Sequence, residues 1–167
     1  RAGDRLFTDR RNPGLFYTAP AAGTIRAISR GRRRSLDSIV IDVEGDEAVQ
    51  FERPAQLGRE TLQSLLMASG GWPSFRSRPF GRLADPQILP SAIFVTAMDT
   101  APLAGDPVIV IRRYETWFHL GAAALRHLTD GPIYICHAAH ASLPVPDGTT
   151  SVLSLIHISE PTRLRRI

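Results

Sequence analysis

The spacing of hydrophobic and polar residues changes twice along the chain. Over residues 1–52, short apolar stretches alternate with turns rich in Gly, Pro, Asn and Asp. Alternation on this scale predicts short β-strands at residues 5–9, 15–18, 24–29, 38–43 and 48–51. Strands this short and this frequent indicate a small β-sandwich or barrel.

A helical spacing follows the β-rich part. Leu62, Leu65 and Leu66 recur at intervals of three and four residues, which predicts a helix over residues 59–68 with one buried face. Gly70 comes directly after it, and glycine readily adopts the left-handed conformation at a helix end. We therefore expect the helix to end there.

The stretch 69–81 is predicted to be neither a regular helix nor a central strand. It holds three aromatic rings and two arginines, and it is interrupted by two prolines and three glycines. Irregular backbone that carries rings and guanidinium groups is either a joint between domains or a ligand surface held on a scaffold.

The next part has the pattern of an α/β domain. Residues 92–98 form a nearly continuous apolar run, of the kind found in a parallel strand that is buried on both faces. The dipeptide Asp106-Pro107 starts a helical pattern with a predicted break at 113–116. A second apolar strand follows at 133–136. Strand, helix and strand at this spacing predict a βαβ unit.

Ligands of such sheets bind beyond the carboxyl ends of the strands, which here means residues 98–105 and 136–141. Asp99 and Asp106 lie near the first strand end, but a hard cation needs several convergent oxygen ligands. We therefore expect Asp106 to cap the helix that follows it and Asp99 to form a side-chain turn with Thr100.

The second strand end carries a C-H-x-x-H cluster formed by Cys136, His137 and His140. A zinc site takes four ligands, and the nearby sequence offers no suitable fourth. We therefore expect a buried thiol and two loop histidines rather than a metal site. No Ser–His–Asp or Cys–His nucleophile arrangement is readable, so no catalytic residue is predicted.

Composition excludes several functions. All twenty basic residues are arginine, so this sequence offers no lysine for a Schiff base, a phosphate-binding P-loop or a lipoyl or biotinyl attachment. One cysteine excludes an internal disulfide. No apolar run is long enough to span a membrane.

The end of the sequence resembles a translated sequencing adapter. The run Leu153-Ser-Leu-Ile-His-Ile-Ser-Glu-Pro-Thr-Arg163 matches the in-frame translation of a transposase adapter, so we expect residues 153–167 to be non-native. Without those residues, which hold three arginines and one glutamate, the formal charge falls from +4 to +2. The chain also starts without Met, and we expect a fragment truncated at both ends.

The β-rich part resembles a biotinyl/lipoyl-type barrel-sandwich hybrid. The resemblance rests on two runs, Gly3-Asp4-x-Leu6-Phe7 and Ala19-Pro20-x-x-Gly23-x-Ile25. In that family a modified lysine lies on the hairpin between the two runs, and residues 9–14 fill that place here. The resemblance therefore implies the shape of the domain without its swinging arm.

Three runs in order resemble the A subunit of the bacterial Na+-translocating NADH:quinone reductases. They are Asn12-Pro13-Gly14 with Thr18-Ala19-Pro20-Ala21-Ala22-Gly23, Ser69-Gly70-x-Trp72 with Arg76-x-Arg78-Pro79-Phe80, and Ile93-Phe94-Val95-x-Ala97-Met98-Asp99-Thr100-x-Pro102-Leu103-Ala104. With this resemblance, the fold class expected is α+β or α/β. We expect four segments: a partial barrel-sandwich hybrid domain, a helix with a connecting loop, a partial Rossmann-like α/β domain and the adapter-derived tail, at residues 1–53, 54–90, 91–152 and 153–167.

The resemblance implies a peripheral subunit on the cytoplasmic face of the bacterial inner membrane. The complex oxidises NADH, reduces ubiquinone and exports Na+. The subunit is expected to lack a cofactor and an activity of its own, with FMN, FAD, riboflavin and iron–sulfur centres in other subunits. It is expected to contribute to assembly and to the quinone and inhibitor region. Its implied partners are the other subunits, especially a membrane subunit, and ubiquinone, with no nucleic acid.

The α/β domain of that family is related to the flavin subunit of respiratory complex I and to the C subunit of the Rnf complex, which hold FMN on a glycine-rich loop. Here the corresponding loop is 69–80, where bulky Trp72 and Pro73 follow a single glycine pair. Close approach of backbone to phosphate needs glycine at several positions, so this loop is a poor cradle. An Rnf-type C subunit that binds FMN or NADH is the alternative function.

Two surfaces have open interpretations. The quinone-proximal candidates are Trp72, Phe75, Arg76, Arg78, Phe80 and Arg82. Their rings could stack on a quinone and an arginine could donate to its carbonyl, or the group could be an interdomain joint. The basic run 30–34 is a solvated loop, or it contacts an acidic subunit or anionic lipid head groups.

Overall fold

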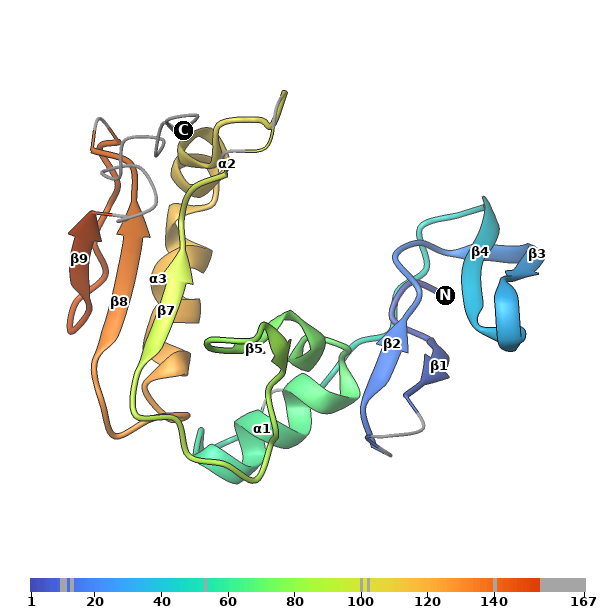
Figure 1. The fold of residues 1–167 in the computed structure, drawn as a ribbon, viewed down its shortest axis with the longest axis horizontal. Coiled ribbons are helices and arrows are strands. Elements are labelled where there is room, and N and C mark those ends of the chain that lie inside the picture. The colour runs from blue at the N-terminus through green and yellow to red at the C-terminus, as the bar shows by residue number, and fades with distance from the viewer. Residues whose placement is uncertain are drawn as a thin grey trace, which may run out of the picture. The chain divides into compact units, whose positions relative to one another are not determined.

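The structure is a computed structural model that describes residues 1–9, 12, 14–52, 54–99, 101, 103–139 and 141–153. The chain divides into two compact units, Arg1–Ile88 and Leu89–Ile167. The first unit contains β1 to β6 and helix α1, and the second contains α2, α3 and β7 to β9 (Figure 1).

The first unit begins with two antiparallel strand pairs. Strand β1 (Arg5–Thr8) pairs with β2 (Phe16–Thr18), and β3 (Gly23–Arg30) pairs with β4 (Leu36–Val43). These four strands lie where the sequence predicts strands, although β4 starts two residues earlier.

The predicted strand at 48–51 is wrong. Only Ala48 forms an isolated bridge, and its partner is Ala2. The amide of Val49 donates to the carbonyl of Ala2 at 2.8 Å, so this segment pairs with the start of the chain and not with β4.

Two register shifts give hairpin β3–β4 one apolar face. Ile25 faces Ile41 and Ile28 faces Ile39, although Ile25 and Ile28 are three positions apart. Residues three positions apart in a strand normally point to opposite faces. Ile25 and Ile28 share a face here because the register shift between Ile25 and Ala27 adds one residue to β3. Ile25 and Ile28 are 47% and 51% exposed, so the described part of the chain leaves much of this face uncovered.

Helix α1 (Arg59–Ala68) has the predicted bounds. Leu62 is buried, and the amide of Ser69 donates to the carbonyl of Leu65 at 2.8 Å in the last turn. Gly70 then takes a φ of +75°, which is the left-handed conformation expected at a helix end. The predicted end of the helix is therefore confirmed.

The second unit is built on a parallel sheet with the order β7-β8-β9. Its elements are β7 (Ile93–Thr96), α2 (Pro107–Arg113), α3 (Glu115–Leu125), β8 (Ile133–His137) and β9 (Thr150–Leu153). The predicted βαβ unit is confirmed, and the predicted break falls at Tyr114, whose φ of −117° and ψ of 34° separate the two helices. Strand β9 is not predicted by the sequence pattern.

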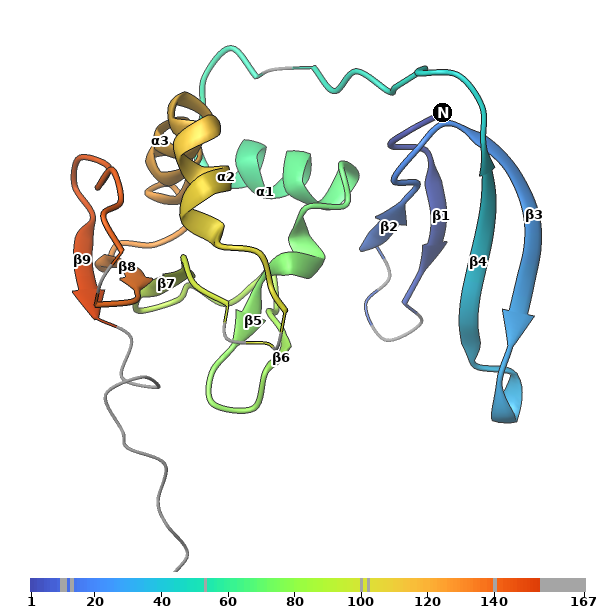
Figure 2. The same ribbon diagram turned by 90° about the horizontal axis from the view of Figure 1, so that it is seen from above.

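The core of this unit lies on one side of its sheet. Both helices are on that side (Figure 2). Ala97, Ile133 and Ile135 are buried, and half-buried hydrophobic residues pack against them: Ile93, Val95, Ile111, Phe118, Leu125 and Leu143.

The prediction that the first strand of this sheet is buried on both faces is wrong. Phe94 is 54% exposed and stacks on Tyr134, with 5.0 Å between ring centroids. Its apolar run therefore serves a core on one face and an exposed aromatic pair on the other. No helix in the described residues is both long and apolar enough to cross a membrane.

Candidate functional site

The loop after α1 is fixed by packing within the first unit. A Cβ atom on Gly70 would lie 2.5 Å from Oγ1 of Thr18, and one on Gly71 would lie 3.1 Å from the side chain of Leu66. The hydroxyl of Thr18 also donates to the carbonyl of Ser69 at 3.2 Å. Both glycines are therefore explained by close approach of the chain to itself.

Trp72 anchors this loop. It starts a 3₁₀ turn over Trp72–Ser74 and is only 6% exposed. Its indole Nε1–H donates to the carbonyl of Ala84 at 2.9 Å, and its ring centroid lies 5.3 Å from that of half-buried Phe75. A buried indole with a satisfied N–H is a packing element.

A short hairpin rises from this anchor. Strands β5 (Arg76–Ser77) and β6 (Arg82–Leu83) are antiparallel, and residues 78–81 form the turn between them. Phe80 is 79% exposed, and the guanidinium carbon of Arg82 lies 5.6 Å from its ring centroid.

The structure divides the six quinone-proximal candidates into two groups. Trp72 and Phe75 lie at the base of the hairpin, in the interior of the first unit. The other four are exposed and form what we call the hairpin tip: Arg76, Arg78, Phe80 and Arg82. Within the described residues no ion pair joins a tip arginine to a carboxylate. The tip thus presents one ring and three cationic groups to solvent.

The loop does not fit the phosphate of a flavin nucleotide. A phosphate cradle needs backbone amides that point at the ligand and room for the phosphate to approach them. Here the amides of Ser74 and Phe75 donate to the carbonyls of Gly71 and Trp72, at 3.1 and 3.0 Å. The space beside the glycine pair is occupied by Thr18 and Leu66.

The loop after the first strand of the parallel sheet contains structural aspartates. Oδ1 of Asp99 accepts from the amide of Ala101, and Oδ1 of Asp106 accepts from the amide of Val108, both at 2.9 Å. The predicted side-chain turn and helix cap are therefore confirmed. Thr100, which was expected to share the turn of Asp99, lies outside the described residues.

The loop after the second strand holds a histidine whose ring nitrogens both have partners. Nδ1 of His137 lies 2.8 Å from the carbonyl oxygen of Ala138, and Nε2 lies 2.7 Å from the hydroxyl of Ser151. The carbonyl can only accept, so Nδ1 carries the proton and donates. Cys136 is half-buried, His140 lies outside the described residues, and the part of the chain that is described groups no three potential metal ligands.

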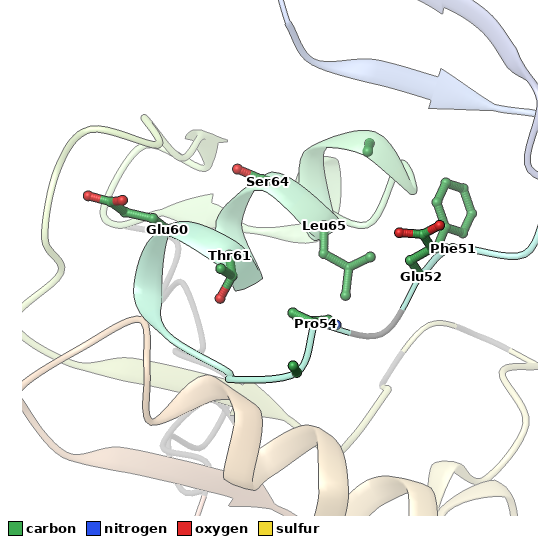
Figure 3. A pocket seen from close by; sticks show the side chains of 9 residues that line it. Phe51, Glu52, Pro54, Glu60, Thr61, Ser64 and Leu65 are labelled. Carbon is green, nitrogen blue, oxygen red and sulfur yellow. The ribbon is translucent and has the colours of Figure 1, made fainter.

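One open hollow was missed by sequence reasoning. It has a volume of about 690 Å³ and lies between helix α1 and the segment before it, and Figure 3 shows its lining, which includes Phe51, Glu52, Glu60, Thr61 and Leu65. The two carboxylates lie at opposite ends (Figure 3), and the hydroxyl of Thr61 already accepts from the amide of Gly58 at 2.8 Å. The described residues that line the hollow form no convergent polar set.

Two family models match the chain in order. One is described as the NqrA N-terminal barrel-sandwich hybrid domain and matches residues 1–44, and the other as the NqrA second alpha/beta domain and matches residues 57–160. The chain is thus a barrel-sandwich hybrid segment followed by an α/β domain, which confirms the predicted fold class. The second match extends beyond Leu153, where the resemblance to an adapter begins.

Curated relatives identify the family. The chain is 48% identical over 144 residues to the A subunit of the Na(+)-translocating NADH-quinone reductase of Yersinia pestis, covering 83% of this chain and 32% of the relative. It is 43% identical over 188 aligned positions to the same subunit of Serratia proteamaculans, covering 99% and 41%, and 47% identical over 149 residues to that of Saccharophagus degradans, covering 86% and 33%. The chain belongs to the family formed by the A subunits of Na+-translocating NADH-quinone reductases, and it spans about a third of the length of these relatives.

Proposed function

We propose that this chain is part of a peripheral, cofactor-free subunit of a sodium-pumping NADH:ubiquinone oxidoreductase. The subunit works with the other subunits on the cytoplasmic face of the inner membrane, contributes to assembly and forms part of the quinone and inhibitor region. Family membership supports the complex, since the relatives are named as its A subunit. The single observation that carries the role is the separation of a buried Trp72 anchor from an exposed hairpin tip.

The absence of a flavin is supported by the use of the loop. Trp72 is buried and donates a hydrogen bond to the carbonyl of Ala84. It occupies the position at which related subunits continue their glycine-rich loop. To admit a phosphate, the loop would have to lose this packing and free the amides of Ser74 and Phe75. The loop therefore serves as a scaffold for the tip.

The chemistry of the tip suits a quinone head group. Phe80 offers an exposed ring face for stacking, and the guanidinium groups of Arg76 and Arg78 can donate to a quinone carbonyl oxygen. A cation beside that oxygen would also stabilise negative charge that develops on reduction. The tip would bind and orient the quinone, while electrons come from cofactors in other subunits.

The second unit has an apolar surface that the described residues leave uncovered. Five apolar side chains of α2, α3 and the residue between them are 50–67% exposed, namely Ile109, Val110, Tyr114, Trp117 and Leu120. Exposed apolar side chains gathered on one helical segment mark a surface that other protein covers. Because the relatives are about three times as long as the matched region, we assign this surface to the remainder of the same subunit.

The quinone role is tested in the reductase assembled with a full-length NqrA that carries this sequence. The Arg76→Ala/Arg78→Ala and Phe80→Ala variants should each weaken the binding of a quinone-site inhibitor by about tenfold or more, which corresponds to about 1.4 kcal/mol. The matched control is Arg33→Ala/Arg34→Ala, which removes two exposed arginines elsewhere and should leave inhibitor affinity unchanged. Normal assembly with unchanged affinity in the tip variants would contradict the quinone role.

The proposed absence of a bound flavin is tested by a separate measurement. The visible absorption spectrum of the purified full-length protein should contain no stoichiometric flavin. A stoichiometric flavin spectrum would favour the alternative, an Rnf-type C subunit that binds FMN or NADH. It would also require the amides of the Trp72 loop to be free in solution, which hydrogen exchange can measure.

A further inference from the structure

A second basic turn lies at the end of hairpin β3–β4. We call it the arginine turn, and its members are Arg30, Arg32, Arg33 and Arg34. All four are exposed, and within the described residues none forms an ion pair with a carboxylate. Four uncompensated positive charges therefore lie within five consecutive positions.

Apolar side chains lie on the same face as these charges. Arg30 is the cross-strand partner of Leu36, and Ile28 lies two positions before Arg30 on the same strand. Residues in such positions share one face of a hairpin. Ile28 is 51% exposed and Leu36 is 37% exposed, so the end of this face combines aliphatic and cationic groups.

The backbone of the arginine turn is ordered but unfavourable for its residues. The amide of Gly31 donates to the carbonyl of Ser35 at 2.8 Å, which closes the turn. Arg33 and Arg34 take φ values of +56° and +60°, where glycine or asparagine is more stable than arginine. Local stability therefore does not explain arginine at these two positions.

We propose that the arginine turn docks on the surface of an anionic lipid bilayer. Arginines near such a surface are attracted by its negative head groups. Adjacent aliphatic side chains leave water when they insert at the level of the acyl chains, and this transfer lowers the free energy of binding. Acidic side chains of a protein partner would satisfy the charges alone, whereas a bilayer interface takes up both the cationic groups and the exposed Ile28 and Leu36. This inference does not depend on the quinone role of the hairpin tip.

The test is the partition of the full-length subunit that carries this sequence onto vesicles at about 0.15 M salt, where the Debye length is about 8 Å. Vesicles of phosphatidylglycerol and phosphatidylcholine in equal amounts should bind the chain, and pure phosphatidylcholine vesicles should not. The Arg32→Gln/Arg33→Asn/Arg34→Asn variant should bind about 100-fold more weakly, since each arginine near the surface contributes about fivefold. Asn is used at the two left-handed positions so that the turn keeps its conformation.

The matched control removes the same charge from the other basic hairpin. Arg76→Gln/Arg78→Gln/Arg82→Gln should change partition by no more than about threefold, because none of these three side chains belongs to the proposed docking surface. Equal losses in the two triple variants, or equal partition onto neutral vesicles, would overturn the proposal. Binding to polyglutamate without partition onto anionic vesicles would also overturn it, in favour of an acidic protein partner.

Insertion of the aliphatic side chains into the bilayer is tested separately by tryptophan fluorescence. A Leu36→Trp variant should show a blue-shifted emission on anionic vesicles, because the new indole leaves water. The parent protein, which contains Trp72 and Trp117 and lacks a tryptophan at position 36, provides the baseline spectrum. An emission that stays unshifted while the chain is bound would show that no apolar side chain enters the interface, and would overturn the docking geometry.

Discussion

Hairpins β3–β4 and β5–β6 both carry exposed arginines beside exposed apolar side chains, but they are held in different ways. Trp72 and Phe75 pack together at the base of hairpin β5–β6 and anchor it, whereas Phe80 at the tip is exposed and does not contribute to this packing. Every residue of β3 is exposed, and Ile25 and Ile28 share one face with Arg30. Structural and surface roles are therefore divided among different residues in β5–β6, whereas they are combined on one face in β3–β4.

The largest effect is expected from removing the anchor of β5–β6. Trp72→Ala should lower the free energy of unfolding by about 3–5 kcal/mol, because it removes a buried ring and leaves the carbonyl of Ala84 without its donor. Phe80→Ala should cost less than about 0.5 kcal/mol, since that ring is mostly exposed. Urea unfolding measures both, and similar losses would remove the distinction between anchor and tip.

A second matched pair compares a buried core with the exposed face of β3–β4. Ile135 is 0% exposed, so Ile135→Ala should cost about 2–5 kcal/mol. Ile25→Ala removes the same atoms from a side chain that is 47% exposed and should cost about 1 kcal/mol or less. The urea midpoints, followed by circular dichroism, give both values. A large loss at Ile25 would mean that other protein covers this face in solution.

How much the sequence predicts depends on whether a signal is local. The bounds of α1 are readable because leucine spacing and Gly70 act within one helix. The opposite burial of Trp72 and Phe80 is not readable, because both are rings in one irregular run and only the tertiary contact with Ala84 separates them. The candidate site was therefore predicted as a segment, whereas its division into anchor and tip required the structure.

Strand pairing sets a similar limit. The alternation in β3 is weak in sequence because a register shift after Ile25 changes the phase of the apolar face. The run at 48–51 has strand composition, but Ala48 finds its partner at Ala2, far away in sequence. Strand β9 was missed because Thr150–Leu153 has no long apolar run and is recognisable only by its pairing with β8.

An intermediate effect is expected at the glycine that leads into the anchor. Gly70→Ala should cost about 2–3 kcal/mol, because alanine is disfavoured at a φ of +75° and its Cβ would meet Oγ1 of Thr18. In a Thr18→Ala background, Gly70→Ala should cost only about 1 kcal/mol of unfolding free energy. The steric contact is then gone and only the backbone strain remains. A double-mutant cycle in urea measures the coupling, and additive costs would mean that Thr18 does not confine the loop.

The smallest effect should have the opposite sign, and it lies in the arginine turn. Arg33→Asn/Arg34→Asn should raise the free energy of unfolding by about 0.5–1 kcal/mol, because asparagine tolerates the left-handed conformation that both positions adopt. Arg30→Asn is the control, since Arg30 lies in an extended strand, where asparagine is disfavoured. This variant should not raise the free energy of unfolding. The urea midpoint of the double variant should rise while its partition onto anionic vesicles falls. A lower midpoint would mean that the two arginines stabilise the turn, and their presence would then need no lipid surface to explain it.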